Sequence, residues 1–169
     1  VSRAKADMRS IATALEAYRI DWNWYPICGS RIDMIAGQTV DTAHLNFTLS
    51  TPTSYLTSVN IYDPFNVHYM HIWDRTFRYL NIDETYGPTH STAGPEYYGA
   101  YQLVFGKWLL SSDGPDQAQG PRTADNGTPP GLWWAAEIYD ATNGTVSGGD
   151  IHRSQRYGGD QIYTGEFLP

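Results

Sequence analysis

The stretch VSRAKADMRSIATALEAYRIDWNWYP, residues 1–26, predicts one amphipathic helix with an abrupt end. Alanine recurs five times between residues 4 and 17 and gives the stretch a high helix propensity. Pro26 has no amide hydrogen to donate and favours an extended Tyr25, so we expect the helix to end between Ile20 and Asn23. The apolar side chains alternate at intervals of four and three residues, which places them in one stripe along the helix: Ala4, Met8, Ile11, Leu15, Tyr18 and Trp22.

Such a narrow apolar stripe needs a partner surface. It can pack on the sheet of its own domain, it can contact neighbouring copies of the chain, and both can hold at once. The helix is already under way at Val1, without a Ser, Thr, Asp or Asn cap and without Met. This beginning predicts a further segment upstream of the sequence.

The size and charge of the chain limit its class. At 169 residues it fits one domain, with a helical stalk over 1–23 and a head over 24–169. A formal net charge of -7 argues against a nucleic-acid partner, because phosphate binding needs clustered Lys and Arg. Charged residues make up 17% and aromatic residues 14%, a balance that suits an extracytoplasmic protein. Cys28 is the only cysteine, and we expect a buried small apolar residue there.

Short elements are predicted between residues 51 and 96. Cap and proline signals favour a short helix over Thr51–Val59. Asp63-Pro64-Phe65-Asn66 has the composition of a turn. Alternating residues predict a strand over Val67–Trp73 and a second over Phe77–Asn81. Gly and Pro residues predict a loop over Asp83–Glu96.

The second half of the chain contains the clearest strand signal. Alternation over Tyr97–Ser111 predicts this strand, and Gly106 marks a bend or bulge in it. The last third is poor in regular structure: Leu132–Tyr139 could be a strand or one helical turn, and Tyr139–Ile151 is a long loop rich in oxygen ligands. Together the elements predict an α+β fold, with one long N-terminal helix packed on a small antiparallel sheet with extended C-terminal loops.

Three segments, in chain order, resemble the type II secretion major pseudopilin and related type IV pilin-like proteins. The resemblance covers the helix and most of the domain. The first segment, which is the most specific, combines residues 4–11 with residues 14–21 and Tyr25-Pro26. The second combines residues 49–52 with Tyr55-Leu56 and Asp63-Pro64-Phe65. The third joins residues 108–112 and Gly114-Pro115-Asp116 to Gly149-Asp150-Ile151.

This resemblance implies a filament subunit that assembles rather than catalyses. The family's very hydrophobic N-terminal helix half would lie before Val1, in the inner membrane and later in the core of a helical fibre. The implied partners are copies of the same chain and related minor pilins, and the implied location is the bacterial cell envelope or an extracellular filament. The side chains that would bundle the helices are Ala4, Met8, Ile11 and Leu15.

The resemblance also implies a calcium ion in the C-terminal loops. Calcium takes six to eight oxygen ligands, and the positions that match are Asp116 and Asp150 as carboxylates, with the Asp113 carbonyl and Ser147 as weaker ligands. Reasoning from the residues alone adds Asp140 and Asn143. Asp-Gly and Asn-Gly pairs are also plain turn formers, and the segment between Asp116 and Asp150 is longer than the family's compact loop.

Other chemistry has less support. No nucleophile elbow, zinc-protease helix or phosphate loop occurs, so we expect no enzyme. Two carboxylates for glycoside hydrolysis could be chosen from Asp83, Glu84, Glu96, Asp116 and Glu137, but any acidic chain offers such pairs. His68 and His71 would point to opposite faces of a strand, so the two rings could not easily share a metal ion. The main alternative is a secreted carbohydrate-binding module with an aromatic platform of Trp108, Trp133 and Trp134.

Overall fold

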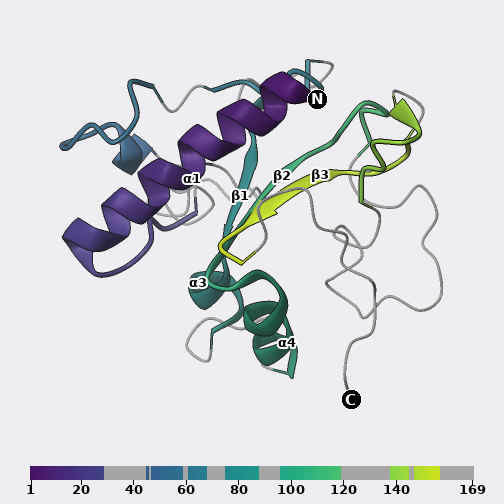
Figure 1. The fold of residues 1–169 in the computed structure, drawn as a ribbon. Coiled ribbons are helices and arrows are strands. Elements are labelled where there is room, and N and C mark those ends of the chain that lie inside the picture. Colours follow the sequence, from purple (N-terminus) through teal and green to yellow (C-terminus); the bar gives the residue numbers. More distant parts are fainter. Residues whose placement is uncertain are drawn as a thin grey trace, which may run out of the picture.

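The computed structural model of the chain describes residues 1–28, 45, 47–58, 61–67, 75–87, 96–118, 138–144 and 147–156. Its main elements are a long N-terminal helix, α1 (Ser2–Trp22), and a three-stranded antiparallel sheet that this helix contacts (Figure 1). The fold is therefore α+β, as predicted. Within the described ranges, no helix combines the length and the hydropathy that crossing a membrane requires.

Helix α1 ends where the sequence predicts. Asn23 closes it in the left-handed conformation, with φ at 64°. The backbone N–H of Asn23 donates to the carbonyl of Arg19 at 2.9 Å, and Arg19 Nη1 donates to Asn23 Oδ1 at 2.8 Å. Beyond this cap the chain is held near the sheet, because Tyr79 donates its hydroxyl to the carbonyl of Pro26 at 2.8 Å. The cap and this anchor together give the sharp reversal after the helix.

The sheet has the order β1-β2-β3, with β1 (Arg78–Asn81), β2 (Trp108–Ser112) and β3 (Ile151–Ser154). On one side of the central strand Tyr79 pairs with Leu110, and on the other side Ser112 pairs with Ile151. Every residue of β2 is buried. A strand that is buried on both faces loses the polar alternation of a half-exposed one.

The hydrophobic core lies between α1 and one face of the sheet. The helix side chains of the predicted stripe are buried, except Trp22, which is 42% exposed. Their partners on the strands are Tyr79, Trp108, Leu110 and Ile151. Because full burial of one Leu or Ile side chain stabilises a fold by about 1.5–3 kcal/mol, the stripe fastens α1 to its own sheet.

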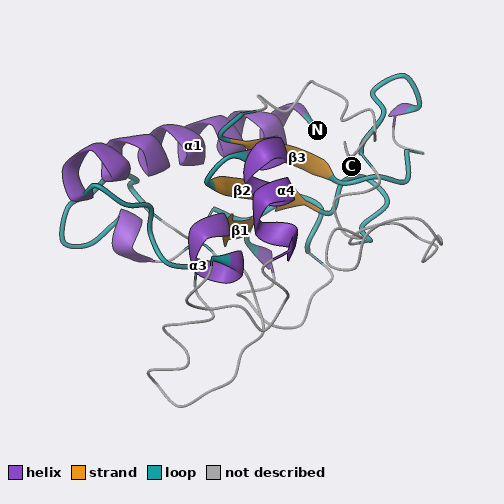
Figure 2. Ribbon diagram, turned by 90° about the horizontal axis from the view of Figure 1, so that it is seen from below, coloured by secondary structure: helices purple, strands orange, loops and turns teal. Residues whose placement is uncertain are grey.

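Two short helices stand at the end of the sheet where β1 finishes and β2 begins (Figures 1 and 2). They are α3 (Ile82–Tyr86) and α4 (Glu96–Phe105). The sequence predicts a loop and a strand over these ranges, and both predictions are wrong there.

Helix α4 replaces the first part of the strand predicted over Tyr97–Ser111. Its buried side chains Tyr101, Val104 and Phe105 are three and four residues apart, whereas Leu103 is 58% exposed, so the apolar run has helical periodicity. Gly106 has φ at 83°, and its N–H donates to the carbonyl of Gln102 at 3.0 Å. This glycine therefore ends a helix and makes no bulge within a strand.

Helix α3 has a start signal in the sequence that the loop prediction overlooks. The side chain of Asn81 accepts the backbone N–H of Glu84 at 3.2 Å, which is an N-cap bond. Asp83 and Glu84 place two acidic residues in the first turn, where the helix dipole favours them.

The short helix predicted over Thr51–Val59 is absent from its described part, residues 51–58. A 3-10 turn, η1 (Phe47–Leu49), precedes it instead. The N–H groups of Tyr55 and Leu56 both donate to the carbonyl of Leu49, at 2.9 and 3.0 Å. These residues therefore close a loop over η1 and form no helical ladder.

Four further predictions have different outcomes. The turn at Asp63–Asn66 is confirmed, since the N–H of Asn66 donates to the carbonyl of Asp63 at 3.2 Å. The loop predicted over Tyr139–Ile151 ends at β3, a strand that the sequence analysis misses. Apart from Val67, the strand predicted over Val67–Trp73 lies outside the described residues, as does Leu132–Tyr139 up to residue 137.

Candidate functional site

The loops that carry the predicted metal ligands meet at one end of the sheet. Asp113 follows β2 directly and Asp150 precedes β3, and the pairing of Ser112 with Ile151 places both aspartates at this end. Both side chains are completely buried. Asp113 forms an ion pair with Arg78, and Ser111 Oγ donates to Asp150 Oδ2 at 3.3 Å. Each carboxylate therefore has a structural partner.

Close backbone packing joins the two loops. Gly114 has φ at 69°, and a Cβ atom there would lie 2.4 Å from the carbonyl oxygen of Gly149. A Cβ atom on Gly149 would lie 2.5 Å from the carbonyl carbon of Ile138. The N–H of Tyr139 also donates to the carbonyl of Asp150 at 2.9 Å. The two parts of the third resembling segment, residues 114–116 and 149–151, are thus neighbours in space.

Three of the predicted ligands close their own loop. Asp140 is exposed and accepts the N–H and the hydroxyl of Thr142, at 2.8 and 2.7 Å, and these bonds hold the pKa of its carboxyl below the usual value. Asn143 Nδ2 donates to Asp140 Oδ2 at 3.2 Å. Ser147 Oγ accepts the N–H of Asp140 at 2.8 Å. These contacts are those of an Asx turn, which is the plain turn-forming alternative.

The predicted ligands do not form one set of carboxylates. Asp116 is half-buried, and its Oδ1 accepts the N–H of Ala118 at 3.4 Å. Among the described residues, which include Asp113, Asp116, Asp140 and Asp150, no three His, Cys, Asp or Glu side chains are grouped so that they could hold a metal ion. A calcium ion at this end of the sheet would need backbone carbonyl oxygens for much of its coordination.

Asp63 is a buried acid for which the sequence predicts a turn and no buried site. Its Oδ1 accepts the N–H of Phe65 at 3.0 Å. The pKa of Asp63 is raised to about 6, first by burial and also by the charge of Asp113, against hydrogen bonds from Phe65 and Ser112 that lower it. The pattern Asp63-Pro64-Phe65 predicts the turn, but only the folded chain brings it beside Ser112 and Asp113.

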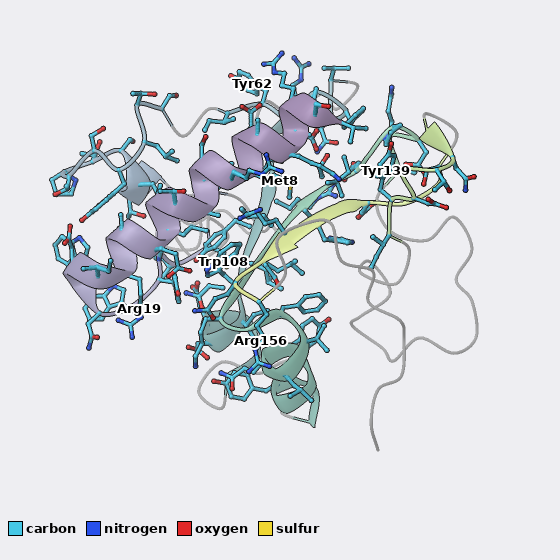
Figure 3. The ribbon with its side chains drawn as sticks, in the orientation of Figure 1. Met8, Arg19, Tyr62, Trp108, Tyr139 and Arg156 are labelled. Atoms are coloured by element: carbon cyan, nitrogen blue, oxygen red, sulfur yellow. The ribbon has the colours of Figure 1, made fainter. Side chains whose placement is uncertain are left out.

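The four predicted filament contacts are buried between α1 and the rest of the chain. Ala4, Ile11 and Leu15 are fully buried, and Met8 is 1% exposed, within a single copy of the chain. Figure 3 shows Met8 and Trp108 between α1 and the strands, with Arg19 near the far end of the helix. Contact between copies through these four side chains would require α1 to leave its sheet.

Trp108 contradicts its predicted place in an exposed aromatic platform. It is 2% exposed, and its indole N–H donates to Glu16 Oε1 at 2.9 Å. Trp133 and Trp134, as well as His68 and His71, lie outside the described residues. Trp108 is therefore not part of an exposed platform, and a platform formed by the other two tryptophans stays a prediction.

The remaining predictions concern the cysteine and the carboxylates. Cys28 is buried, as predicted for a small apolar residue. Asp83 and Glu84 follow β1, so they lie at the opposite end of the sheet from Asp116, which follows β2. This separation excludes a direct pair between Asp116 and either α3 carboxylate.

Scans against protein-family models, curated proteins and solved structures found no match to this chain.

Proposed function

We propose that the chain is a non-enzymatic structural subunit of a type II secretion pseudopilus or of a related type IV pilus-like filament. The observation that supports this most concerns residues 114–116 and 149–151. The resemblance joins them although they are far apart in sequence, and in the structure they are neighbours. Gly114 packs on Gly149, next to the paired ends of β2 and β3. A long N-terminal helix across an antiparallel sheet is the second support.

In this proposal the stripe of α1 holds the head together, and the outer face of α1 meets other copies. The side chain of Arg3 is 76% exposed and Ile20 is 82% exposed, so both ends of α1 offer side chains to a neighbour. An upstream hydrophobic helix would supply the membrane anchor and the fibre core. The partners are further copies and minor pilins, in the bacterial envelope or in an extracellular filament.

Calcium belongs to the proposal as a stabiliser of the C-terminal loops. Asp116 and Asp150 are the carboxylates that would hold the ion, and the Asp113 carbonyl would add an oxygen. The buried position of Asp150 beside the Gly114–Gly149 contact supports a role in the shape of this end of the head. Asp140 and Asn143 have partners in their own turn, so we place them outside the proposed ligand set.

Immunogold electron microscopy of the native protein in its own cells tests the proposal. We expect labelled filaments, and we expect the exposed-face variant Ile20→Asp to reduce them while the purified variant chain stays folded. Thr13→Ala, another exposed position on α1, is the control and should assemble normally. A monomer secreted by cells that make no filament would contradict the proposal, and glycan binding by that monomer would favour the carbohydrate-binding alternative.

A further inference from the structure

An open cleft of about 740 Å³ lies between the end of α1 and helix α3. Its volume falls within the usual range for small-molecule sites, about 300–1,000 Å³. Two basic side chains, Arg19 and Lys107, and two acidic ones, Asp83 and Glu84, contribute to its lining. The cleft is far from the Gly114–Gly149 contact. Helix α3 follows the end of β1 that pairs with the start of β2, whereas Gly114 comes after the end of β2.

Trp24 is presented at this cleft by the reversal of the chain. Asn23 is left-handed and Tyr25 is 6% exposed, so Tyr25 turns inward while Trp24 between them is 61% exposed. The inward position is fixed, since Tyr25 donates its hydroxyl to Glu16 at 2.9 Å. A largely exposed indole ring, carried by a turn that is anchored at Tyr25, offers an apolar face that a ligand can cover.

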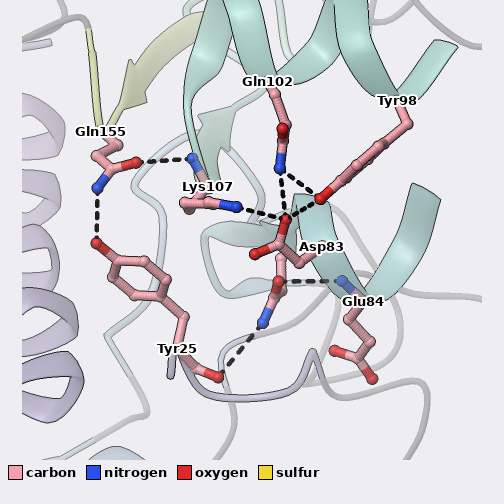
Figure 4. A network of polar contacts seen from close by, with 8 residues as sticks. Tyr25, Asp83, Glu84, Tyr98, Gln102, Lys107 and Gln155 are labelled. Atoms are coloured by element: carbon pink, nitrogen blue, oxygen red, sulfur yellow. Dashed lines mark hydrogen bonds and ion pairs between the residues drawn. The ribbon is translucent and has the colours of Figure 1, made fainter. Parts of the chain in front are cut away.

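The polar groups of the cleft are held in place before any ligand binds (Figure 4). Asp83 Oδ1 accepts from Tyr98 at 2.5 Å, from Gln102 at 2.6 Å and from Lys107 at 3.0 Å. Burial favours the protonated carboxyl, but these bonds hold the pKa of Asp83 below its usual value. All three bonds end on Oδ1, and Figure 4 shows the second oxygen pointing away from the three donors. Asp83 therefore offers a fixed, ionised acceptor.

A second fixed group is Gln155, just after β3. Its Oε1 accepts the N–H of Lys107 at 2.8 Å, and its Nε2 donates to the hydroxyl of Tyr25 at 2.8 Å. On the other side, Glu84 Oε2 accepts the N–H of Cys28 at 2.7 Å. The lining thus combines amide and carboxylate groups whose directions are set by bonds to the backbone and to neighbouring side chains.

We propose that this cleft binds a neutral oligosaccharide. The indole of Trp24 can cover the apolar C–H face of a sugar ring, and the carboxylate of Asp83 can accept from its hydroxyl groups. Acidic and basic lining residues balance, and Lys107 is already bonded to Asp83, so the cleft does not favour an ionic ligand. The proposal depends on the cleft alone and holds whether or not the chain forms filaments.

Saturation-transfer NMR and calorimetry with cellotriose, maltotriose and N,N′,N″-triacetylchitotriose test this proposal on the chain as it is. We expect at least one of them to bind with a dissociation constant of about 1 mM or below. Trp24→Ala should weaken that binding by about tenfold or more, because it removes the ring that stacks on the sugar. Asp83→Asn keeps the shape but replaces an ionised acceptor, and should weaken binding by about threefold to tenfold.

Trp22→Ala is the matched control, since this exposed tryptophan two residues away does not line the cleft. It should leave the affinity unchanged, and far-UV circular dichroism should show that all three variants are folded. No binding of any of the three sugars at about 10 mM would overturn the proposal. Binding that survives Trp24→Ala would also overturn it, as would Trp24-dependent self-association without sugar binding, which would make a second copy the occupant.

Discussion

Trp108 in the central strand donates its indole N–H to Glu16 of α1 at 2.9 Å. The same carboxylate accepts the hydroxyl of Tyr25 at 2.9 Å, and Tyr25 accepts from Gln155 Nε2 at 2.8 Å. Burial, and then the bond to Glu16, raise the pKa of Tyr25, so that its hydroxyl stays a donor. One carboxylate therefore joins the helix, the turn after it and the sheet.

Loss of this carboxylate should destabilise the fold. In Glu16→Leu the indole N–H of Trp108 and the hydroxyl of Tyr25 lose their acceptor in a part-buried site, and we expect the free energy of unfolding to fall by about 1–3 kcal/mol. Glu16→Gln keeps an oxygen acceptor and should lose less. Urea unfolding followed by tryptophan fluorescence measures both values, and equal stability of Glu16→Leu and the parent chain would contradict the network's role.

Two isoleucines of α1 provide a matched test of which face of the helix is core. Ile11 is fully buried, whereas Ile20 is 82% exposed. Ile11→Ala should lower the free energy of unfolding by about 2–5 kcal/mol, because it leaves a cavity in a packed interior. Ile20→Ala should change it by about 0.5 kcal/mol or less. Similar losses for the two variants in urea titrations would show that α1 does not pack on its sheet through this stripe.

The helix could be predicted because its signals are local. The stripe from Ala4 to Trp22 and the stop before Pro26 both lie within one segment, and the structure confirms them except at Trp22. Trp22 is partly exposed because it lies at the edge of the core. There it stacks on Tyr18 and donates to the hydroxyl of Tyr55 at 3.1 Å. Propensity and spacing do not encode such an edge position.

The strand predicted over Phe77–Asn81 is confirmed as β1, but several other elements and groups that depend on distant partners could not be predicted. Aromatic residues in α4 suit a strand or a helix, and their packing decides for the helix. Strand β3 is short and exists through its pairing with β2. Likewise, Asp63 looks like any turn residue until the fold buries it beside Ser112 and Asp113. The candidate site was therefore predictable in its segments but not in its contacts.

Alanine variants of Gly114 and Gly144 distinguish the cost of backbone strain from the cost of disturbing close packing. Both glycines have positive φ, at 69° and 57°, so alanine costs each about 1–2 kcal/mol of conformational strain. A Cβ atom at position 114 would also lie 2.4 Å from the carbonyl of Gly149, whereas nothing lies within 4 Å of one at position 144. We expect Gly114→Ala to lower the melting temperature clearly more than Gly144→Ala. Equal shifts in differential scanning calorimetry would contradict the close contact with Gly149.

Asp63 and His152 should give the stability opposite dependences on pH. The raised pKa of Asp63, about 6, means that the folded chain binds more protons than the unfolded chain between about pH 4 and 6, so this residue's contribution falls as pH rises. Burial lowers the pKa of His152 to about 4, so its contribution rises with pH from about 4 to 6.5. The two effects partly cancel in the parent chain.

Asp63→Asn removes the first effect and keeps an acceptor for the N–H of Phe65. As pH rises from 4 to 6, we expect the free energy of unfolding of this variant to increase by about 2 kcal/mol relative to that of the parent chain. His152→Gln removes the second effect and should change the pH dependence in the other direction. Urea titrations at several pH values measure both, and parallel curves for Asp63→Asn and the parent chain would show that Asp63 does not titrate in this window.

Calcium should raise the thermal stability of the chain if Asp116 and Asp150 hold the ion. A ligand that binds only the folded state stabilises it by about 2.7 kcal/mol at 100 times its dissociation constant. For a domain of this size, adding a chelator should then lower the melting temperature by about 5–10 °C. Differential scanning fluorimetry in calcium and in EGTA measures this shift.

Variants at Asp116 and Asp140 locate the ion. Asp116 is half-buried next to the joined loops, so Asp116→Asn should abolish the difference between calcium and EGTA. Asp140 accepts from Thr142 in its own exposed turn, so Asp140→Asn should keep the difference. Identical melting curves of the parent chain in calcium and in EGTA would rule out calcium as a stabiliser, because a bound ion must shift the unfolding equilibrium. The filament proposal would survive that result, since packing of Gly114 on Gly149 would then hold the loops without a metal.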